Sequence, residues 1–376
     1  MVIRSDGPRD NARDGAVRDG AVRDGAVRAS ARGRRVGLKD IADELGISQT
    51  AVSFAINDRP GVSEETKRKV KMAAAKLGWT PVYAAQALGS SKTMTVGFAP
   101  SRSADELQDE SFMLHFMTGL HASLSRKGYG LLYRPCASLR EELAVYRDWS
   151  ARKRVDGVVL VDLRADDPRP ALLNRLGVPA VLAGGPDPSS LMPSLSIDDG
   201  GTMETVLRHL LERGHRRIAY ISGDPTLDYS KDREAAFRAF AKRRRLESIH
   251  VEFTDFKTER ASELTLRLMA LPVPPTAFIY ESETLAAASL RSVAAHLIAQ
   301  GRGLEGVPAI VSFEDSFICE AAYPSITSVH RDASEYGAKV AKLLLKVLAG
   351  DPVSGNRRIL KPELVIREST SRSINV

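Results

Sequence analysis

Several groups of residues in this sequence have types and spacings that could do chemistry, and the first is a glycine motif. Gly301, Gly303 and Gly306 match the G-x-G-x-x-G pattern that cradles dinucleotide phosphates. That fingerprint needs a strand before it and a helix after it, whereas here a helical stretch precedes the glycines and Pro308 with the strand-like run AIVSF follows. We therefore expect an ordinary loop between a helix and a strand.

Metal ligands and paired catalytic carboxylates are also weakly supported. His209 and His215 are six positions apart around an expected helix end and have no third ligand nearby, so we expect solvated or locally capping side chains. Asp198 and Asp199 precede an expected helix, and carboxylates at that place commonly cap the N-terminus. The sequence has no Walker loop, no G-x-S-x-G elbow and no H-E-x-x-H helix. It predicts a protein that is not an enzyme and that holds no metal and no cofactor.

The composition narrows the class of protein. The chain has 376 residues, of which 43% are apolar and 27% are charged, close to an average soluble protein. No apolar run approaches the roughly 20 residues that cross a bilayer, and the first 30 residues contain no apolar segment typical of a secretory signal. Two cysteines, Cys136 and Cys319, exclude a disulfide framework. We expect a cytoplasmic protein of two or three domains with no membrane partner.

The net charge of +7 is concentrated at the N-terminus. Residues 1–92 contain 17 Lys and Arg against 11 Asp and Glu, while the remainder is nearly neutral. Part of this excess lies in a threefold RDGAV repeat, and alternating Arg and Asp with Gly offers nothing to bury, so residues 1–35 are predicted to be a disordered low-complexity extension. A basic front attached to a neutral body indicates a module that binds a polyanion, the alternative being a solvated charged tail.

Residues 36–82 have the pattern of three short helices. The first ends at Gly46, and the second, which Ser48 can cap, begins about three residues later. The break at 59–61 precedes a third helix, capped by Ser63 and ended by Gly78. Two helices joined by so short a turn, with a third behind them, are the helix-turn-helix signature. The positions expected to be buried are Leu38, Ile41, Ala42, Leu45, Ala51, Val52, Ala55, Ile56, Val70, Ala73, Ala74 and Leu77.

The body of the chain reads as an α/β protein. Residues 83–92 have too few apolar side chains for a core and are predicted to be a linker. From Thr93 on, short apolar runs that predict buried parallel strands alternate with amphipathic helical stretches, such as those at 112–127, 200–213, 231–244, 259–270 and 283–300. The runs lie at 95–99, 130–133, 157–161, 180–183, 218–222, 277–280 and 309–313. So many strands favour two doubly wound subdomains with a ligand cleft between them.

With these residues in view, the chain resembles a LacI-type bacterial transcription repressor, of the lactose and galactose repressor family, over positions 36–370. The resemblance rests on the order and spacing of LKDIA at 38–42, GIS at 46–48, Val52-Ser53, Asn57, Val62-Ser63 and Thr66. In the body it rests on GHRRIAYISG at 214–223, Arg233, SFED at 312–315, YPSITSV at 323–329 and LVIREST at 364–370.

The resemblance implies an all-α helix-turn-helix DNA-binding head at 36–82 and a hinge helix at 83–92. It also implies an effector-binding and dimerisation core at 93–376 like a periplasmic binding protein. In that core the chain crosses three times between an N-subdomain, about 93–196 and 325–354, and a C-subdomain, about 197–324 and 355–370.

The resemblance also implies which residues contact DNA. The family's base-contacting positions of the recognition helix fall on Gln49, Thr50 and Phe54, with Ser53 in the same outward stripe. Gln can bond adenine in two places, Thr offers a hydroxyl and a methyl, and Phe can pack on a thymine methyl. The family often has Arg or His where Phe54 stands. Phosphate-contacting and hinge positions, where a leucine wedges between base steps, complete the set: Lys39, Ser48, Asn57, Ser63, Ala85 and Leu88.

In the core, the implied effector-binding residues are Ser111, Phe112, Arg233, Ser282 and Glu314. For Phe112 the alternative is packing in the hydrophobic core. Arg233 matches an arginine that bonds effector hydroxyls or carboxylates, and Glu314 matches an aspartate that pairs with sugar hydroxyls. Glu283 and Glu314 stand where the family usually has the shorter Asp.

The function implied is that of a repressor of transcription that binds palindromic double-stranded operator DNA. Its operator affinity is controlled by a small effector, most simply a carbohydrate. It is expected to bind as a homodimer, because the two-fold symmetry of a dimer matches the operator. The alternative from another class is a sugar-binding or sugar-processing protein with a vestigial head. Deleting residues 36–92 distinguishes the two, because function is lost only under the first.

Overall fold

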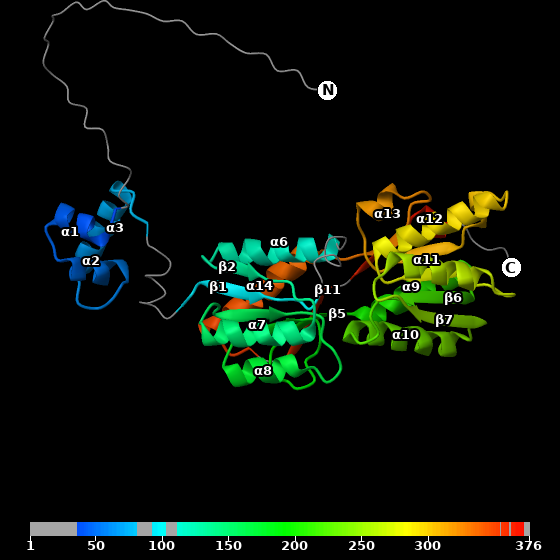
Figure 1. Ribbon diagram of the computed structural model, residues 1–376, viewed down its shortest axis with the longest axis horizontal. Coiled ribbons are helices and arrows are strands. Elements are labelled where there is room, and N and C mark those ends of the chain that lie inside the picture. Colours follow the sequence, from blue (N-terminus) through cyan, green and yellow to red (C-terminus); the bar gives the residue numbers. More distant parts are fainter. Residues whose placement is uncertain (1–35, 81–91, 103–110, 354, 361, 372–376) are drawn as a thin grey trace, which may run out of the picture. The chain divides into compact units, whose positions relative to one another are not determined.

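The computed structural model describes residues 36–80, 92–102, 111–353, 355–360 and 362–371 (Figure 1). The chain forms two compact units that divide at Pro81 and Val82. Residues 1–35, the extension expected to be disordered, lie outside the described residues. So does the expected hinge at 83–92 except for Lys92, and with it Ala85 and Leu88. No helix in the described ranges is long and apolar enough to span a membrane.

The N-terminal unit is the expected three-helix head. It contains α1 (Leu38–Leu45), α2 (Gln49–Ile56) and α3 (Glu64–Lys76). Gly46 ends α1 with a φ of +64°, which a residue without a Cβ adopts without strain. The core contains the predicted apolar positions except Ala51, with Ile41, Val52 and Val70 fully buried. Ile47, Val62 and Trp79, which were not predicted, also pack against it. The helix-turn-helix prediction is confirmed.

The N-subdomain of the body is a parallel sheet of six strands in the order β11-β5-β4-β3-β1-β2. Helices α6 and α14 cover one face, with buried side chains in a shared core, while α7 and α8 cover the other (Figure 1). The strands are β1 (Thr95–Phe98), β2 (Gly130–Tyr133), β3 (Gly157–Leu160), β4 (Ala180–Ala183), β5 (Ser194–Ile197) and β11 (Asn356–Leu360). The helices are α6 (Ser111–Ser125), α7 (Leu139–Ala151), α8 (Pro168–Leu176) and α14 (Ala333–Ala349).

The C-subdomain repeats this architecture with the strand order β12-β10-β9-β8-β6-β7, in which only β12 is antiparallel to its neighbour. Side chains of α9 and α10 pack on one face of the sheet and those of α11 and α12 on the other. The strands are β6 (Arg217–Ser222), β7 (Ser248–Phe253), β8 (Ala277–Tyr280), β9 (Ala309–Ser312), β10 (Thr327–His330) and β12 (Glu363–Val365). The helices are α9 (Asp199–Glu212), α10 (Asp228–Arg244), α11 (Thr258–Met269), α12 (Glu283–Ala299) and α13 (Phe317–Ala321).

The chain crosses between the subdomains three times, but two crossings fall later than expected. Strand β10 pairs with β9 in the C-subdomain, and β11 pairs with β5 in the N-subdomain. The second crossing therefore lies near Arg331 rather than near 325, and the third lies between β11 and β12 rather than near 355. The expected boundaries were wrong because a sequence motif shows where a strand lies in the chain but not which sheet that strand joins.

All seven predicted strands are present, although one is not buried. β2 lies at the edge of its sheet, with its end residues exposed, whereas β3, β4, β8 and β9 are buried throughout. The glycine motif at 301–306 lies between α12 and β9 and contains a single 3-10 turn (Leu304–Gly306), so the loop interpretation is confirmed.

Two helices of the N-subdomain touch backbone to backbone. A Cβ added to Gly119 of α6 would lie 1.9 Å from the carbonyl oxygen of Ser334, and a Cβ added to Gly337 of α14 would lie 2.1 Å from that of Phe116. This approach brings the first turns of α14, which follow the chain crossing at Arg331, against the middle of α6.

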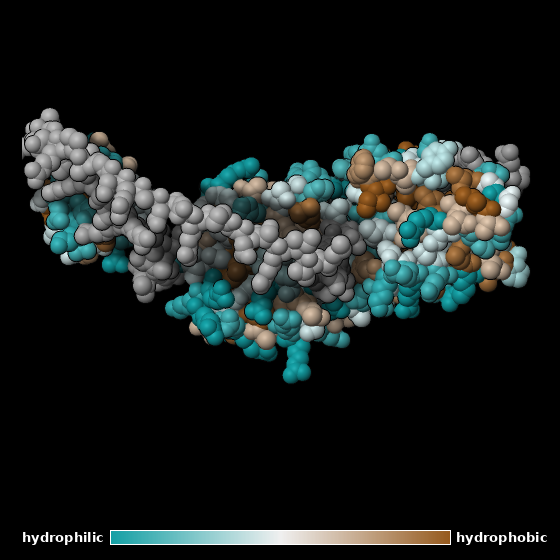
Figure 2. Space-filling model, turned by 45° about the horizontal axis from the view of Figure 1, so that its top comes forward, coloured by the Kyte–Doolittle hydropathy of each residue, from teal (hydrophilic) through white to brown (hydrophobic). Residues whose placement is uncertain are grey.

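Large apolar side chains are exposed on the C-subdomain around α13. Phe317 is 78% exposed and Tyr323, just after the helix, is 76% exposed. Figure 2 shows hydrophobic residues gathered on the C-subdomain over α12 and α13. On the N-subdomain, Leu114 of α6 is 61% exposed.

Candidate functional site

The head presents the expected base-reading residues on α2. Gln49 and Thr50 are exposed in its first turn, while Ser53 and Phe54 are half-buried. The Phe54 ring packs over Gly61, where an added Cβ would lie 3.6 Å from a ring carbon. The face of α2 thus offers an amide, two hydroxyls and the edge of an aromatic ring, which are groups suited to base edges in a major groove.

The polar residues expected at the DNA backbone lie at helix ends. Ser48 caps α2 and accepts a hydrogen bond from the Ala51 amide at 3.1 Å, and Ser63 caps α3 in the same way. A hydroxyl that accepts one bond can still donate its proton to a phosphate oxygen. Asn57 closes α2, where its side-chain amide donates to the Ser53 carbonyl at 2.8 Å. Lys39 is exposed on α1.

The body contains a cavity of about 780 Å³ lined by residues from both subdomains. Its residues follow the carboxyl ends of parallel strands: Asp162 to Arg164 after β3, Glu281 to Thr284 after β8, and Glu314 after β9. Ligands of open α/β sheets bind at these ends, because loops and helix N-termini converge there. Of the five expected effector-binding residues, Phe112, Arg233, Ser282 and Glu314 line the cavity.

Arg233 on α10 lies at the centre of a buried ion cluster. Its side chain is 3% exposed, its Nε donates to Asp199 at 2.8 Å, and its Nη1 donates to Glu281. The guanidinium also lies over the Phe313 ring at 4.4 Å and over the Tyr229 ring at 5.0 Å. Burial alone would lower the pKa of Arg233, but the charges of Asp199 and Glu281 outweigh it and raise that pKa. Arg233 is therefore a fixed cation, neutralised on one side and flanked by rings.

Glu314 is held by a residue that sequence reasoning did not single out. It forms an ion pair with Arg331, which follows β10 at the second crossing. Arg331 lies over the Phe112 ring of the other subdomain at 4.8 Å, and burial together with the positive charge of Arg233 lowers its pKa to about 10. Phe112 also contacts Tyr336, with ring centroids 6.4 Å apart. Cation and rings thus form a wall of the cavity to which both subdomains contribute.

The remaining expected residues lie at two helix N-termini. Ser282 caps α12, and its hydroxyl is 2.9 Å from that of Thr284. Ser111, at the start of α6, donates to a carboxylate oxygen of Glu283 at 2.5 Å, which joins the two subdomains beside the cavity. Glu283 is 1% exposed, so its longer side chain turns inward to meet Ser111.

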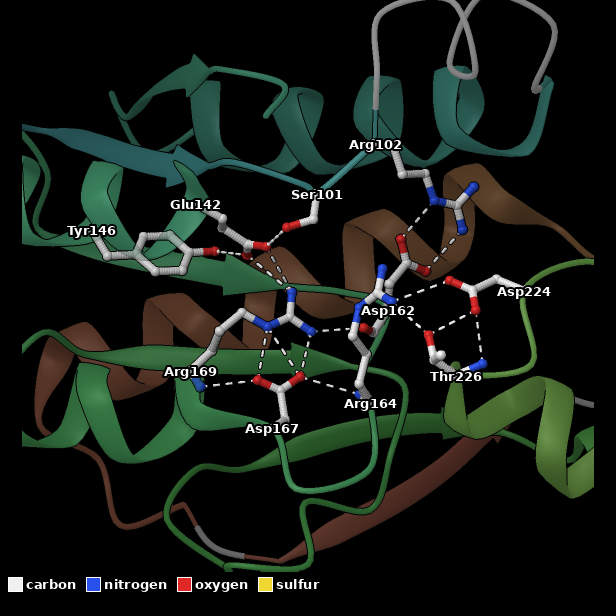
Figure 3. A network of polar contacts seen from close by, with 10 residues as sticks. All are labelled: Ser101, Arg102, Glu142, Tyr146, Asp162, Arg164, Asp167, Arg169, Asp224 and Thr226. Carbon is white, nitrogen blue, oxygen red and sulfur yellow. Dashed lines mark hydrogen bonds and ion pairs between the residues drawn. The ribbon is translucent and has the colours of Figure 1, made fainter. Parts of the chain in front are cut away.

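Another part of the lining was missed in the sequence. Arg102 forms two hydrogen bonds with Asp162, at 2.7 and 2.9 Å, and Arg164 forms an ion pair with Asp224 at 3.1 Å (Figure 3). Behind them, fully buried Arg169 bonds the carboxylates of Glu142 and Asp167. No short motif marks the pairs Arg102–Asp162 and Arg164–Asp224, because the two members of each lie 60 positions apart.

The arginines of the cavity lining are paired within the protein, and carboxylates outnumber cations there. Each of the four lining arginines is paired with a carboxylate, and the lining contains ten Asp and Glu against six Lys and Arg. An anionic ligand would have to compete with these carboxylates for cations already bound. The arrangement suits a ligand with many hydroxyls and no net negative charge, since carboxylates accept and guanidiniums donate hydrogen bonds while rings cover apolar faces.

Two of the earlier interpretations need correction. His209 and His215 are buried rather than solvated, and bond the hydroxyls of Thr370 and Thr276 at 2.8 and 3.0 Å. Asp198 caps α9 as expected, whereas Asp199 accepts a hydrogen bond from Arg233 and does not cap the helix. Among the described residues no group of three or more His, Cys, Asp or Glu is arranged to hold a metal ion.

Comparisons with known proteins agree with this architecture. Residues 37–82 match the family model of bacterial regulatory proteins of the lacI family, and residues 207–370 match that of periplasmic binding protein-like domains. The chain is 31% identical over 344 residues to the HTH-type transcriptional regulator CelR of Thermobifida fusca, covering 90% of this chain and 99% of that protein.

Solved structures are similar over most of the chain. A complex of the transcriptional regulator CelR with cellobiose has 29% identity and a TM-score of 0.65, covering 89% of this chain and 100% of that one. The lac repressor dimer bound to operator and the anti-inducer ONPF has a TM-score of 0.75 at 21% identity, covering 90% and 99%, and so shares the fold. The similar proteins are named as transcriptional regulators and not as enzymes.

Proposed function

We propose that this chain, which belongs to the LacI family of bacterial regulatory proteins and is a transcriptional regulator, is a repressor that binds a palindromic operator as a homodimer. Its operator affinity is set by a neutral carbohydrate in the cavity. The observation that carries the proposal is the pairing of every lining arginine with a carboxylate in an aromatic-walled cavity of about 780 Å³. That volume lies in the range of ordinary small-molecule sites.

The head supports the part of the proposal that concerns DNA. Exposed Gln49 and Thr50 read base edges, and half-buried Ser53 and Phe54 flank them. Ser48 and Ser63 donate to phosphates while their oxygens cap helices, with Asn57 and Lys39 contributing at the edges. In the hinge, which lies outside the described residues, Ala85 and Leu88 enter the minor groove.

The cavity supports a carbohydrate rather than a phosphorylated or carboxylated effector. Arg233 and Glu314 bond ligand hydroxyls from the C-subdomain, Phe112 offers its ring to an apolar sugar face, and Ser111 and Ser282 stand at the helix ends beside them. The similar regulator CelR was solved with cellobiose, a neutral disaccharide. We therefore take cellobiose as the first probe for this cavity.

The exposed apolar side chains support a homodimer. Leu114 of the N-subdomain and Phe317 and Tyr323 of the C-subdomain are each more than half exposed. Burying them against a second copy favours association, since the free energy of apolar burial is about 25 cal/mol per Å². Two heads then meet the two halves of a palindromic operator. Sedimentation at micromolar concentration tests this, and a monomer contradicts it.

The mechanism is a shift of population between two arrangements of the core. An effector that binds both subdomains favours one arrangement over the other, and the difference reaches the heads through the N-subdomain of each protomer. A coupling of about 1–3 kcal/mol changes operator affinity by roughly 5- to 150-fold.

The proposal is tested by selecting an operator from a library of palindromic DNA and measuring its affinity by fluorescence anisotropy. Cellobiose is expected to change the dissociation constant by at least about fivefold, whereas glucose 6-phosphate and adenine leave it unchanged. Phe112→Ala serves as the matched variant, because it removes a cavity ring and leaves the head intact. A response to the phosphorylated sugar or the purine alone contradicts a neutral carbohydrate, and failure to select any DNA contradicts the repressor.

A further inference from the structure

The two subdomains touch through the loop that follows β3, at a contact distinct from the chain crossings. Arg164 Nη1 donates to Asp224 at 3.1 Å and to the Thr226 hydroxyl at 2.5 Å. Beside them the Asp228 amide donates to the Leu163 carbonyl at 2.9 Å. We call Arg164, Asp224 and Thr226 the clasp (Figure 3). Arg164 and Asp224 line the cavity, so the clasp closes part of its wall.

The N-subdomain side of the clasp is anchored by a buried cation. Arg169 is fully buried; its Nη1 donates to Glu142 at 3.0 Å and its Nη2 to the Asp162 carbonyl at 2.6 Å. Asp167, which also bonds Arg169, accepts from the Arg164 amide at 3.1 Å (Figure 3). The loop at 162–167 is therefore fixed at both ends and presents Arg164 in one position.

The C-subdomain side is equally defined but the clasp itself is not strong. Asp224 accepts from the Thr226 amide at 2.7 Å, which shapes the turn before α10. The side chains of Arg164 and Asp224 are each 25% exposed, so solvent screens their attraction. Arg164 Nε is buried without a hydrogen-bond partner, which opposes the closed contact. These opposing effects describe a contact that forms and breaks readily.

We propose that Arg164 is a positioning residue, and that its clasp holds the two subdomains together over the ligand cavity and controls how fast a ligand enters and leaves. The part that concerns ligands rests on the proposed carbohydrate function. Because the clasp joins the two subdomains at the wall of the cavity, its opening widens the path by which a ligand enters and leaves. Breaking the clasp therefore accelerates both association and dissociation.

The opening of the clasp can be measured with no ligand present. The Asp228 amide is bonded across the subdomains, so its hydrogen exchange reports the opening directly. In Arg164→Ala we expect this amide to exchange about tenfold faster than in the wild type, as expected for losing a hydrogen bond to a charged group. Arg164→Lys, which keeps the charge, should fall between them, and amides of β6 should not change.

Arg217→Ala is the matched control. Arg217 forms an ion pair of similar length, 3.0 Å to Glu247, and both partners lie in the C-subdomain. Its loss should leave the exchange of the Asp228 amide unchanged. If the Asp228 amide exchanges at the wild-type rate in Arg164→Ala, the proposal is overturned. The proposal is also overturned if Arg217→Ala accelerates that exchange as much as Arg164→Ala does.

The rates of cellobiose binding, measured by surface plasmon resonance, test the control of access. In Arg164→Ala both rates should rise together, so that the dissociation constant changes less than either rate. A faster dissociation with unchanged association means that Arg164 only contacts the ligand, and this overturns the proposal. If the wild type does not bind cellobiose, the proposed effector is wrong, and exchange at Asp228 still decides whether the clasp exists.

Discussion

Lowering the pH should destabilise the C-subdomain through His215. This residue precedes β6, is 3% exposed, and its Nδ1 is 3.0 Å from the Thr276 hydroxyl. That hydroxyl donates to the Arg217 carbonyl at 3.3 Å, so Nδ1 carries the proton and Nε2 keeps a bare lone pair. Nε2 is buried without a partner, and protonation would bury an N–H with no acceptor.

The size of the effect follows from the pKa. Burial, with the nearby positive charges of His209 and Arg213, lowers the pKa of His215 from 6.5 to about 4. The neutral form is the one favoured by folding, so its contribution is complete above the unfolded pKa and is lost as the pH falls from about 6.5 towards 4. At pH 5 the loss is about 2 kcal/mol of unfolding free energy, since each pKa unit corresponds to about 1.4 kcal/mol.

The assay is urea unfolding followed by circular dichroism at pH 8 and pH 5, for the wild type and for His215→Asn. The Asn amide can donate to Thr276 as Nδ1 does, but it does not titrate. The wild type should lose about 2 kcal/mol more than the variant between the two pH values. Burial also lowers the pKa of His209, but both proteins share that group, so it cancels. Equal pH dependence in the two proteins would refute the argument.

Three other outcomes follow from the packing and the head. Arg169→Met should lower the unfolding free energy in urea by about 3–5 kcal/mol, because Glu142 and Asp167 are left buried without their cation, and a loss below about 1 kcal/mol would contradict this. Gly337→Ala should cost about 1–3 kcal/mol or more by calorimetry, since its Cβ would meet the Phe116 carbonyl at 2.1 Å, whereas Gly200→Ala, with its nearest atom at 3.7 Å, should cost far less. Gln49→Ala should weaken binding to the selected operator by about 1–3 kcal/mol in anisotropy titrations and leave random DNA unaffected; an equal loss on both would contradict base reading.

The elements that could be predicted from the sequence are those whose ends and burial depend on residues close together in the chain. The head could be predicted because Gly46, Ser48, Ser63 and Gly78 mark helix ends, and because its core lies within helices only a few residues apart. The buried central strands could be predicted because a strand covered on both faces must be apolar throughout, as β8 is.

Two of the strands that were not predicted, β7 and β11, lie at sheet edges and are partly exposed to solvent, whereas β5 and β10 lie inside their sheets but contain Ser or Thr among their apolar residues. Every residue of β7 at the edge of its sheet is half-buried, so SIHVEF shows neither a continuous apolar run nor a strict alternation. β11, with the sequence NRRIL, is likewise an edge strand. Strand β10 could be assigned to the wrong subdomain because its partner β9 is chosen by tertiary packing and not by its own residues.

The same reasoning explains the limits at the site. The resemblance could point to Arg233 and Glu314, but the sequence alone does not say with which groups they pair. Glu281 lies 48 positions from Arg233, and Arg331 lies 17 from Glu314. Whether a cavity attracts an anion or a neutral ligand depends on those pairings, because an arginine already bound to a carboxylate offers hydrogen bonds but little net charge. The ligand class therefore follows from the fold, which decides the partner of each charge, rather than from the list of charges.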